Sequence, residues 1–307
     1  MIIAHHLNCV SACPLGGRLM DGRSRSAFER GCLCCHCLLL ETDHGLVLVD
    51  TGYGLRDVND PRGRLSGFFL RLMDPDFREE MTAVRQIERL GFSASDVRHI
   101  VLTHLDFDHA GGLDDFPAAR VHMMRVERDE AQRQRTWLDR QRFRPQQWSS
   151  RERWQVYAAG RGEPWYGFDC VRQLQGLPPE ILLVPLVGHT LGHAGVAVRA
   201  SSCGWMLMAG DAYFHHREMD ARDPWCTPGL RFYQTMMEKD RAARLHNQRR
   251  LRSLRERFGA EITLLSAHDP VEFERAAGRD VNMPADRGSK ADKFTWAAWP
   301  HRREEHS

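Results

Sequence analysis

Histidine and carboxylate side chains crowd into one short segment of the chain. His104, Asp106, Asp108 and His109 fall within six residues, directly after an apolar run that ends at Thr103. Imidazole and carboxylate ligands together suit zinc, iron or manganese. One metal ion does not easily accept four ligands from so short a segment, so the spacing indicates two metals.

The same pattern, an apolar run followed by His or Asp, recurs three times further along the chain. His189, Asp211 and His268 each stand directly or shortly after such a run. The runs alternate with stretches of helical periodicity, which predicts an α/β chain of short strands and helices. Loops at strand ends are where protein scaffolds place their sites. We therefore predict that these three residues complete the metal centre.

The order of these residues resembles the metallo-β-lactamase superfamily. In that family a strand ending in Asp precedes a His-x-His-x-Asp-His motif, a later His, a bridging Asp and a final His. The matching residues here are, in order, Asp50, His104, Asp106, Asp108, His109, His189, Asp211 and His268. The resemblance covers about residues 33–270 and looks closest to quorum-signal lactonases and related small-ester hydrolases. It implies an αββα sandwich with the metals at the edge of its two sheets.

The resemblance also implies how the ligands divide between two divalent metals, with zinc as the first expectation. The ligands of metal one match His104, Asp106 and His189, those of metal two match Asp108, His109 and His268, and the bridge matches Asp211.

Asp106 departs from the family pattern, because the matching position carries His. Two divalent metals, three carboxylates and a hydroxide make a neutral cluster, whereas His at this position leaves a charge of about +1. A less positive site raises the pH at which hydroxide forms, and a carboxylate favours iron or manganese over zinc. The alternative is that Asp106 is not a ligand and that only one metal binds.

Three further residues are predicted to act at the site. We expect Asp50 and His193 to lie behind the ligands and orient them, as the partners of metal-bound histidines do. We expect Tyr213 to polarise a substrate carbonyl, and Asp108 to orient the nucleophile as well as bind metal. His215 or His216 could line the substrate pocket.

These residues predict a metal-dependent hydrolase of a small ester, a lactone or a related carbonyl substrate. Hydroxide held by a metal would attack the carbonyl carbon while a metal polarises the carbonyl oxygen. The sequence contains no Gly-x-Ser-x-Gly motif of a serine hydrolase.

Two other functions stay open. His104, His189 and Asp211 form a two-His, one-carboxylate set that suits non-haem iron, and persulfide dioxygenases of this superfamily use the matching three residues. Flavodiiron proteins also carry a carboxylate at the position of Asp106, but the chain after residue 270 has no room for their flavodoxin domain. The other alternative is a non-catalytic metal-binding module that keeps the fold.

The overall composition argues against a charged macromolecular partner. The chain has 307 residues, with 43 Lys and Arg against 41 Asp and Glu and a net charge of +2. Such a balance gives no attraction to nucleic acid or to an anionic membrane. The apolar runs are too short to span a membrane, and residues 1–6 lack the features of a secretory signal. We therefore expect a cytoplasmic protein that acts on a small molecule, of an oligomeric state that the sequence does not indicate.

The cysteines and the domain limits complete the sequence-based picture. Cys32, Cys34, Cys35 and Cys37 lead into an apolar strand and show no zinc-ribbon spacing, so we predict a structural role for them. One domain is expected over residues 1–275, with a polar, flexible tail over 276–307.

A helical cap is expected at about residues 125–168. Its first part, residues 125–155, is rich in Arg with interspersed aromatic residues. This composition indicates a solvated helix surface with aromatic anchors, and RNA binding by stacking is the alternative. Acidic residues within the segment dilute its charge and argue against RNA.

Overall fold

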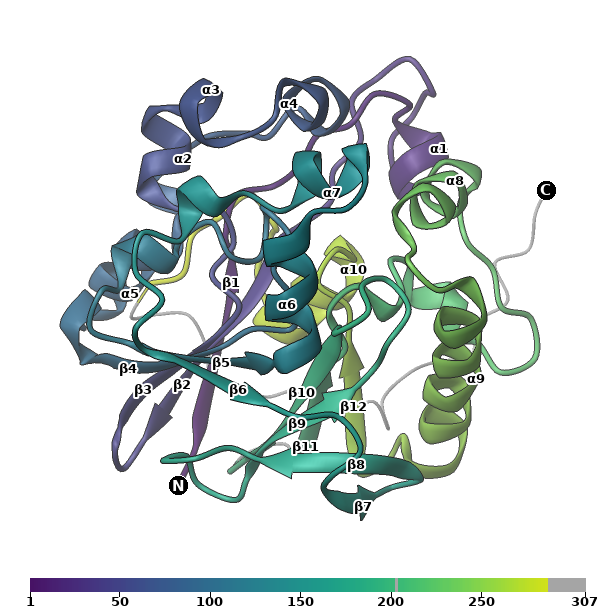
Figure 1. The fold of residues 1–307 in the computed structure, drawn as a ribbon. Coiled ribbons are helices and arrows are strands. Elements are labelled where there is room, and N and C mark those ends of the chain that lie inside the picture. The colour runs from purple at the N-terminus through teal and green to yellow at the C-terminus, as the bar shows by residue number, and fades with distance from the viewer. Residues whose placement is uncertain (202–203, 287–307) are drawn as a thin grey trace.

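The fold is built on two six-stranded sheets (Figure 1). The computed structural model describes residues 1–201 and 204–286. The first sheet contains, in spatial order, β1 (Ile3–Asn8), β2 (His36–Thr42), β3 (Gly45–Val49), β4 (Val97–Val101), β5 (Arg120–Met124) and β6 (Trp154–Tyr157). The second contains β12 (Ile262–Leu265), β11 (Gly204–Met208), β10 (Ala194–Ala200), β9 (Ile181–Pro185), β8 (Phe168–Gln173) and β7 (Glu163–Trp165).

Ten α-helices are found in the described part of the chain. They are α1 (Arg18–Asp21), α2 (Leu55–Asn59), α3 (Pro61–Arg64), α4 (Gly67–Met73), α5 (Ala83–Leu90), α6 (Arg125–Arg133), α7 (Trp137–Arg142), α8 (Pro228–Met237), α9 (Arg241–Phe258) and α10 (Pro270–Ala277). None of these helices combines the length and the apolar character that a membrane span requires.

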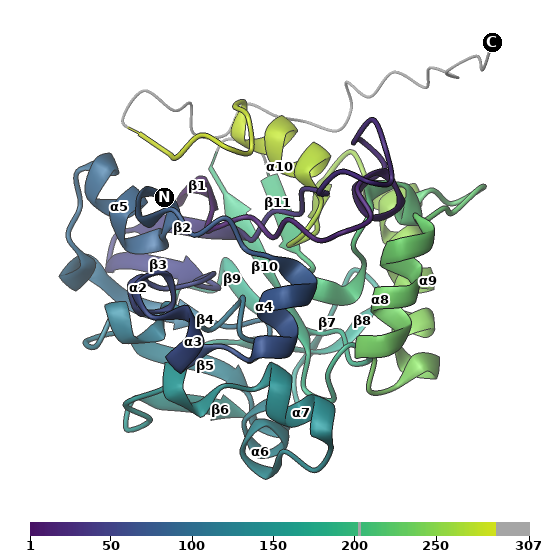
Figure 2. The same ribbon diagram turned by 90° about the horizontal axis from the view of Figure 1, so that it is seen from above.

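The sheets and helices form four layers because apolar residues alternate along the strands. Leu38 and Leu40 of β2 pack between the two sheets, whereas Leu39 packs on the opposite face with Ile87 of α5. Successive side chains of a strand point to opposite faces, so a strand that is apolar throughout needs cover on both. On the second sheet, α9 supplies the outer cover (Figure 2). The αββα sandwich expected from the sequence is therefore confirmed.

Strand direction brings several strand ends to one edge of the sandwich. β3, β4 and β5 are parallel neighbours in the first sheet. In the second sheet β11 is parallel to β12, and β9 shares their direction because β10 is antiparallel to both β9 and β11. The two sheets meet at this edge, where the backbone N–H of Ala194 donates to the carbonyl of Thr103 at 3.0 Å.

The inserted segment is helical over only part of its expected length. α6 and α7 lie within it, but β6, β7 and most of its last part are extended, so the expectation of a helical cap through residue 168 is wrong. Trp154, an aromatic residue of the expected helix surface, is a strand residue instead, as its β-propensity allows.

The predicted tail begins later than expected. Residues 281 and 285 are buried, and the backbone N–H of Ala285 donates to Gln86 Oε1 at 2.8 Å. Residues 276–286 therefore pack on the domain, and the remainder of the predicted tail, with Trp296 and Trp299, lies outside the described residues.

A core substitution between the two sheets tests this layering. Leu183 of β9 is fully buried in the cluster that joins the sheets. Leu183→Ala should lower the free energy of unfolding by about 2–5 kcal/mol, the range for emptying such a site, measured by urea denaturation. Phe28→Ala, at a side chain that is 98% exposed, should change it by less than about 0.5 kcal/mol. Equal effects of the two substitutions would contradict the packing described here.

Candidate metal centre

All seven predicted metal ligands meet at the edge where the two sheets join. Each is buried, with at most 4% of its surface exposed. They follow β4, β9, β11 and β12 and therefore come from both sheets: His104, Asp106, Asp108, His109, His189, Asp211 and His268. Their ligand atoms form two adjacent groups.

The first group consists of His104, Asp106, His189 and Asp211, whose ligand atoms all lie within 4.8 Å of one another. The Nε2 atom of His189 lies 3.0 Å from Asp106 Oδ2 and 3.3 Å from Asp211 Oδ2. The Nε2 atom of His104 lies 3.4 Å from Asp106 Oδ2. Two imidazoles and two carboxylates thus face a common point.

The second group contains His109, His268 and the other oxygen of Asp211. The two Nε2 atoms lie 3.2 Å apart, and each lies 3.1 Å from Asp211 Oδ1. Asp108 borders this group, with its Oδ2 3.7 Å from His268 Nε2. Asp211 thus presents one carboxylate oxygen to each group, which is the arrangement of a bridging ligand.

Polar atoms without partners indicate that cations belong between these groups. His104 Nε2 and Asp211 Oδ1 are buried and form no hydrogen bond within the described residues. Leaving a buried polar atom unpaired costs free energy of about 1–3 kcal/mol. Metal ions would satisfy both atoms, and the imidazole and carboxylate donors are those that zinc, iron and manganese accept. The residues present therefore fit two divalent metals.

Neighbouring residues fix the orientation of the ligands. Asp50 accepts hydrogen bonds from His109 Nδ1 (2.9 Å) and from the backbone N–H of Thr103 (2.8 Å). His193 links two segments near the site. Its Nδ1 lies 2.9 Å from the Leu186 carbonyl, and its Nε2 accepts a hydrogen bond from the backbone N–H of Asp211 at 2.9 Å. Asp50 and His193 thus occupy places from which they can orient the site.

A buried carboxylate ties together the loops that carry His104 and His189. Glu127 of α6 accepts from the backbone N–H of Leu105 at 2.9 Å and from Thr190 Oγ1 at 2.5 Å. The loop after β4 and the loop after β9 are thereby held at a fixed separation by a side chain that belongs to neither.

Arg142 is the residue of this centre that sequence reasoning missed. Its guanidinium is fully buried and donates to both oxygens of Asp106, from Nε at 2.6 Å and from Nη2 at 2.5 Å. Nη1 donates to the carbonyl of Met237 at 2.6 Å, and Nη2 also lies 2.8 Å from His189 Nε2. We expected its segment to be solvated, and no local sequence signal separates Arg142 from the other arginines there.

The Asp106–Arg142 pair changes the charge argument made from the sequence. The carboxylate and the guanidinium together carry no net charge, just as a neutral histidine does. With Arg142 included, the centre regains the charge of about +1 that the family pattern gives. Asp106 therefore gives no electrostatic reason to expect less acidic bound water.

The pKa values of the carboxyl groups reflect these contacts. Burial alone would raise the pKa of Asp106 and of Asp211. Arg142 instead holds the pKa of Asp106 well below its usual value, and the imidazoles of His268 and His109 do the same for Asp211. Both groups are therefore ionised at neutral pH, as metal ligands must be.

The hydroxyl of Tyr213 is bound to a protein side chain. Its side chain packs in the apolar cluster under α9, and its hydroxyl donates to Glu272 at 2.9 Å from Oε2. A buried phenol needs such a partner, and Glu272 of α10 supplies it. The placement gives no support to the expected role of Tyr213 in polarising a substrate carbonyl.

A different tyrosine faces the centre. Tyr233 of α8 is buried, and after burial itself the carboxylates of Asp108, Asp106 and Asp211 are the main causes that raise its pKa well above the usual value. Its ring packs edge-on against Phe214 at 5.7 Å between centroids, and Phe214 stacks on His268 at 5.0 Å.

His215 and His216 form a cluster of their own. Their rings stack at 4.4 Å between centroids, and His216 Nδ1 lies 2.8 Å from Asp269 Oδ2. His215 Nδ1 accepts a hydrogen bond from the backbone N–H of Arg217 at 3.2 Å. Neither belongs to the two ligand groups.

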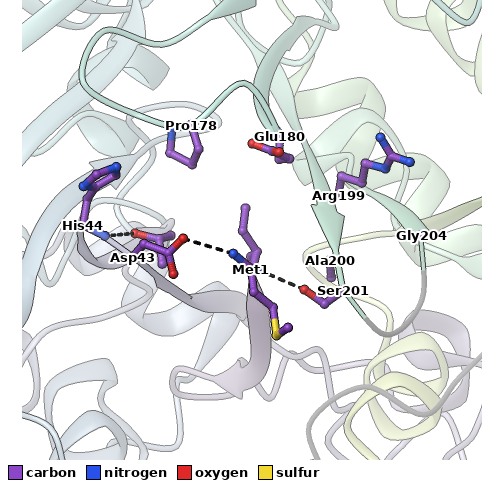
Figure 3. A pocket seen from close by; sticks show the side chains of 11 residues that line it. Met1, Asp43, His44, Pro178, Glu180, Arg199, Ala200, Ser201 and Gly204 are labelled. Atoms are coloured by element: carbon purple, nitrogen blue, oxygen red, sulfur yellow. Dashed lines mark hydrogen bonds and ion pairs between the residues drawn. The ribbon is translucent and has the colours of Figure 1, made fainter.

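One of the described cavities lies away from the centre. It has a volume of about 420 Å³ and is lined by Met1, His44, Glu180 and Arg199 among others (Figure 3). These residues come from the start of the chain, the β2–β3 turn, the segment before β9 and the end of β10. Within this cavity the amino group of Met1 forms an ion pair with Asp43 at 3.2 Å.

Removing the positive partner of Asp106 tests the importance of Arg142. Arg142→Met leaves a buried carboxylate uncompensated and should lower the free energy of unfolding of the metal-free protein by about 3–5 kcal/mol. The double variant Asp106→Asn/Arg142→Met should recover most of this loss, since no buried charge remains. Urea denaturation measures both. A double variant no more stable than Arg142→Met would contradict the pairing.

Comparison with known proteins identifies the family. The model of the metallo-beta-lactamase superfamily matches residues 30–268. A probable metallo-hydrolase of Mycobacterium tuberculosis is 40% identical over 274 residues, which are 89% of this chain and 82% of that protein. An N-acyl homoserine lactonase of a Bacillus species is 27% identical over 190 residues, which are 62% of this chain and 68% of that protein.

The solved structures agree on the fold. The structure of an N-acyl homoserine lactone hydrolase, with the product N-hexanoyl-L-homoserine at its catalytic metal centre, superposes with a TM-score of 0.63. It is 22% identical, and the match covers 87% of this chain and 93% of that one. With two ligand groups joined by a bridging carboxylate and a family match over most of its length, this chain is a member of the metallo-β-lactamase superfamily.

Proposed function

We propose that this protein is a hydrolase of a small ester or lactone that works with two divalent metals, zinc being the first choice. The observation that carries the proposal is the bridging position of Asp211, whose two carboxylate oxygens face two separate groups of histidines. Its relatives support the reaction class, since they include a probable metallo-hydrolase and an N-acyl homoserine lactonase.

The metals, when bound, polarise a carbonyl oxygen and supply hydroxide at neutral pH. The protein contributes the positions of the reacting groups. Asp108 and His268 lie side by side at the second ligand group, so Asp108 can orient the attacking oxygen as well as bind metal. Tyr233 lies close enough to the same carboxylates for their charges to raise its pKa, so its neutral hydroxyl can donate to a substrate oxygen. The Asp106–Arg142 pair keeps the first group rigid.

An apolar cluster beside the centre favours a substrate with an apolar part. Tyr53, Phe107, Phe214 and Tyr233 pack with residues of α4 and α8 in this cluster. Beyond it the nearby helices carry exposed apolar side chains, such as Phe232 at 69% and Trp137 at 54% exposure. An acyl chain attached to the scissile carbonyl would bury such surface, and each buried methylene contributes about 0.8 kcal/mol. We therefore propose acylated lactones or esters.

Iron-dependent redox chemistry is the second candidate, and one observation favours it. Arg142 engages both oxygens of Asp106. If this pairing keeps Asp106 from binding metal, the first group retains His104, His189 and Asp211, which is the ligand set of non-haem iron enzymes.

Metal content and turnover together test the proposed function. Protein purified without added metal or chelator should contain two metals per chain by elemental mass spectrometry and hydrolyse acylated lactones or esters. Chelation should abolish this hydrolysis, and zinc added back should restore it, because the metals supply the attacking hydroxide. One iron per chain with oxidation of a persulfide, and no hydrolysis, would decide for the second candidate.

Two tyrosine variants test which phenol acts on the substrate. Tyr233→Phe removes a donor that faces the centre and should lower kcat on the order of 10²-fold, the effect of losing one such donor. Tyr213→Phe removes a hydroxyl bound to Glu272 and should leave kcat of the folded enzyme unchanged. Steady-state kinetics measures both. The reverse result would restore Tyr213 as the residue that polarises the carbonyl.

A further inference from the structure

The cysteine run near the start of β2 distributes its side chains to different parts of the molecule. Cys37 packs with Cys9 in the core between the first sheet and α5. Cys34 points toward α10, packs with Phe273 and donates its thiol to the carbonyl of Ala267 at 3.5 Å. Cys35, the next residue, belongs instead to the apolar cluster beside the metal centre.

The sulfur of Cys35 lies among metal ligands. Its Sγ and the ligand atoms of Asp108 and His268 all lie within 4.8 Å of one another, and all three residues are buried. Cys35 is a free cysteine with 2% of its surface exposed. A thiol, a carboxylate and an imidazole at such separations are a donor set for zinc.

The backbone holds this sulfur in place. The N–H of Cys35 donates to Asn8 Oδ1 at 2.8 Å, and its carbonyl accepts from the N–H of Cys9 at 2.8 Å. The preceding carbonyl, of Cys34, lies 2.7 Å from His268 Nδ1. This contact leaves the Nε2 atom of His268 facing the metal position. Two consecutive residues thus lie against the same ligand group, Cys34 with its carbonyl and Cys35 with its thiol.

We propose that the sulfur of Cys35 is an additional donor to the metal held by Asp108, His109 and His268. This inference rests on the metal binding that the proposed function requires, but not on the identity of the substrate. A coordinating metal deprotonates a thiol outright, so a buried neutral thiol is a suitable precursor of this ligand.

Sulfur at one position makes the two metal sites chemically different. The first group offers nitrogen and oxygen donors, with Asp106 held by Arg142. The second offers nitrogen, oxygen and sulfur. Soft thiolate ligands select zinc, whereas carboxylates suit manganese and other hard ions. We therefore expect zinc at the second position to be retained more strongly, while the first position exchanges its metal.

Cobalt substitution tests the proposal without measuring turnover. The metal-free protein is titrated with two equivalents of Co²⁺, and the near-ultraviolet absorption band of a thiolate bound to cobalt is recorded. The band should appear in the natural protein and in Cys34→Ala, the adjacent buried cysteine that points away, and should be lost in Cys35→Ala. The zinc dissociation constant of one site should rise about tenfold or more in Cys35→Ala alone.

Absorption spectroscopy at the zinc edge gives a second measurement that needs no variant. The protein loaded with two zinc ions should show one sulfur neighbour, at about 2.3 Å, for every two zinc ions. Two bound zinc ions without sulfur, or a cobalt band that persists in Cys35→Ala, would overturn the assignment of Cys35 and leave the proposed hydrolase intact. Failure of the protein to bind any metal would overturn both.

Discussion

The structure depends on the burial of four carboxylates at the edge where its two sheets meet. Asp50, Asp106, Asp108 and Asp211 are each at most 4% exposed. Buried charges are tolerated only when they are paired or bind metal. Arg142 pairs Asp106, and imidazoles surround Asp211. Other contacts keep these charged groups in place. Glu127 binds the loop that carries His104, and His193 accepts a hydrogen bond from the backbone of Asp211.

The clustering of the candidate ligands could be predicted from the sequence because their signal is local. A His or Asp that follows a short apolar run needs no knowledge of distant residues to be recognised, and four of the ligands lie within six positions. The sandwich could be predicted for a related reason, since fully apolar strands such as β2 demand cover on both faces.

What could not be predicted depends on contacts between distant segments. Arg142 contacts Asp106, which lies 36 positions away in the sequence. The arginine-rich segment that contains Arg142 indicated a solvated surface. Tyr233 and Tyr213 both belong to the region after Asp211, and only the packing of α8 and α9 decides which phenol faces the ligands. Cys34 and Cys35 are indistinguishable in sequence, yet the extended backbone turns them to opposite sides. The strands β6 and β7 were missed because aromatic residues suit both helix anchors and short strands.

With metals bound as proposed, the positions of the candidate ligands along the chain would give the centre a part in folding as well as in chemistry. Metals that joined His104 and His189 to Asp211, and His109 to His268, would close loops of up to 159 residues between segments that follow different strands. No partly formed domain can present this full set, because β12 must already lie beside β11 before His268 arrives. Tight metal binding would therefore report that the sandwich is complete, and it would restrain the separation of its two halves in the manner of a covalent cross-link.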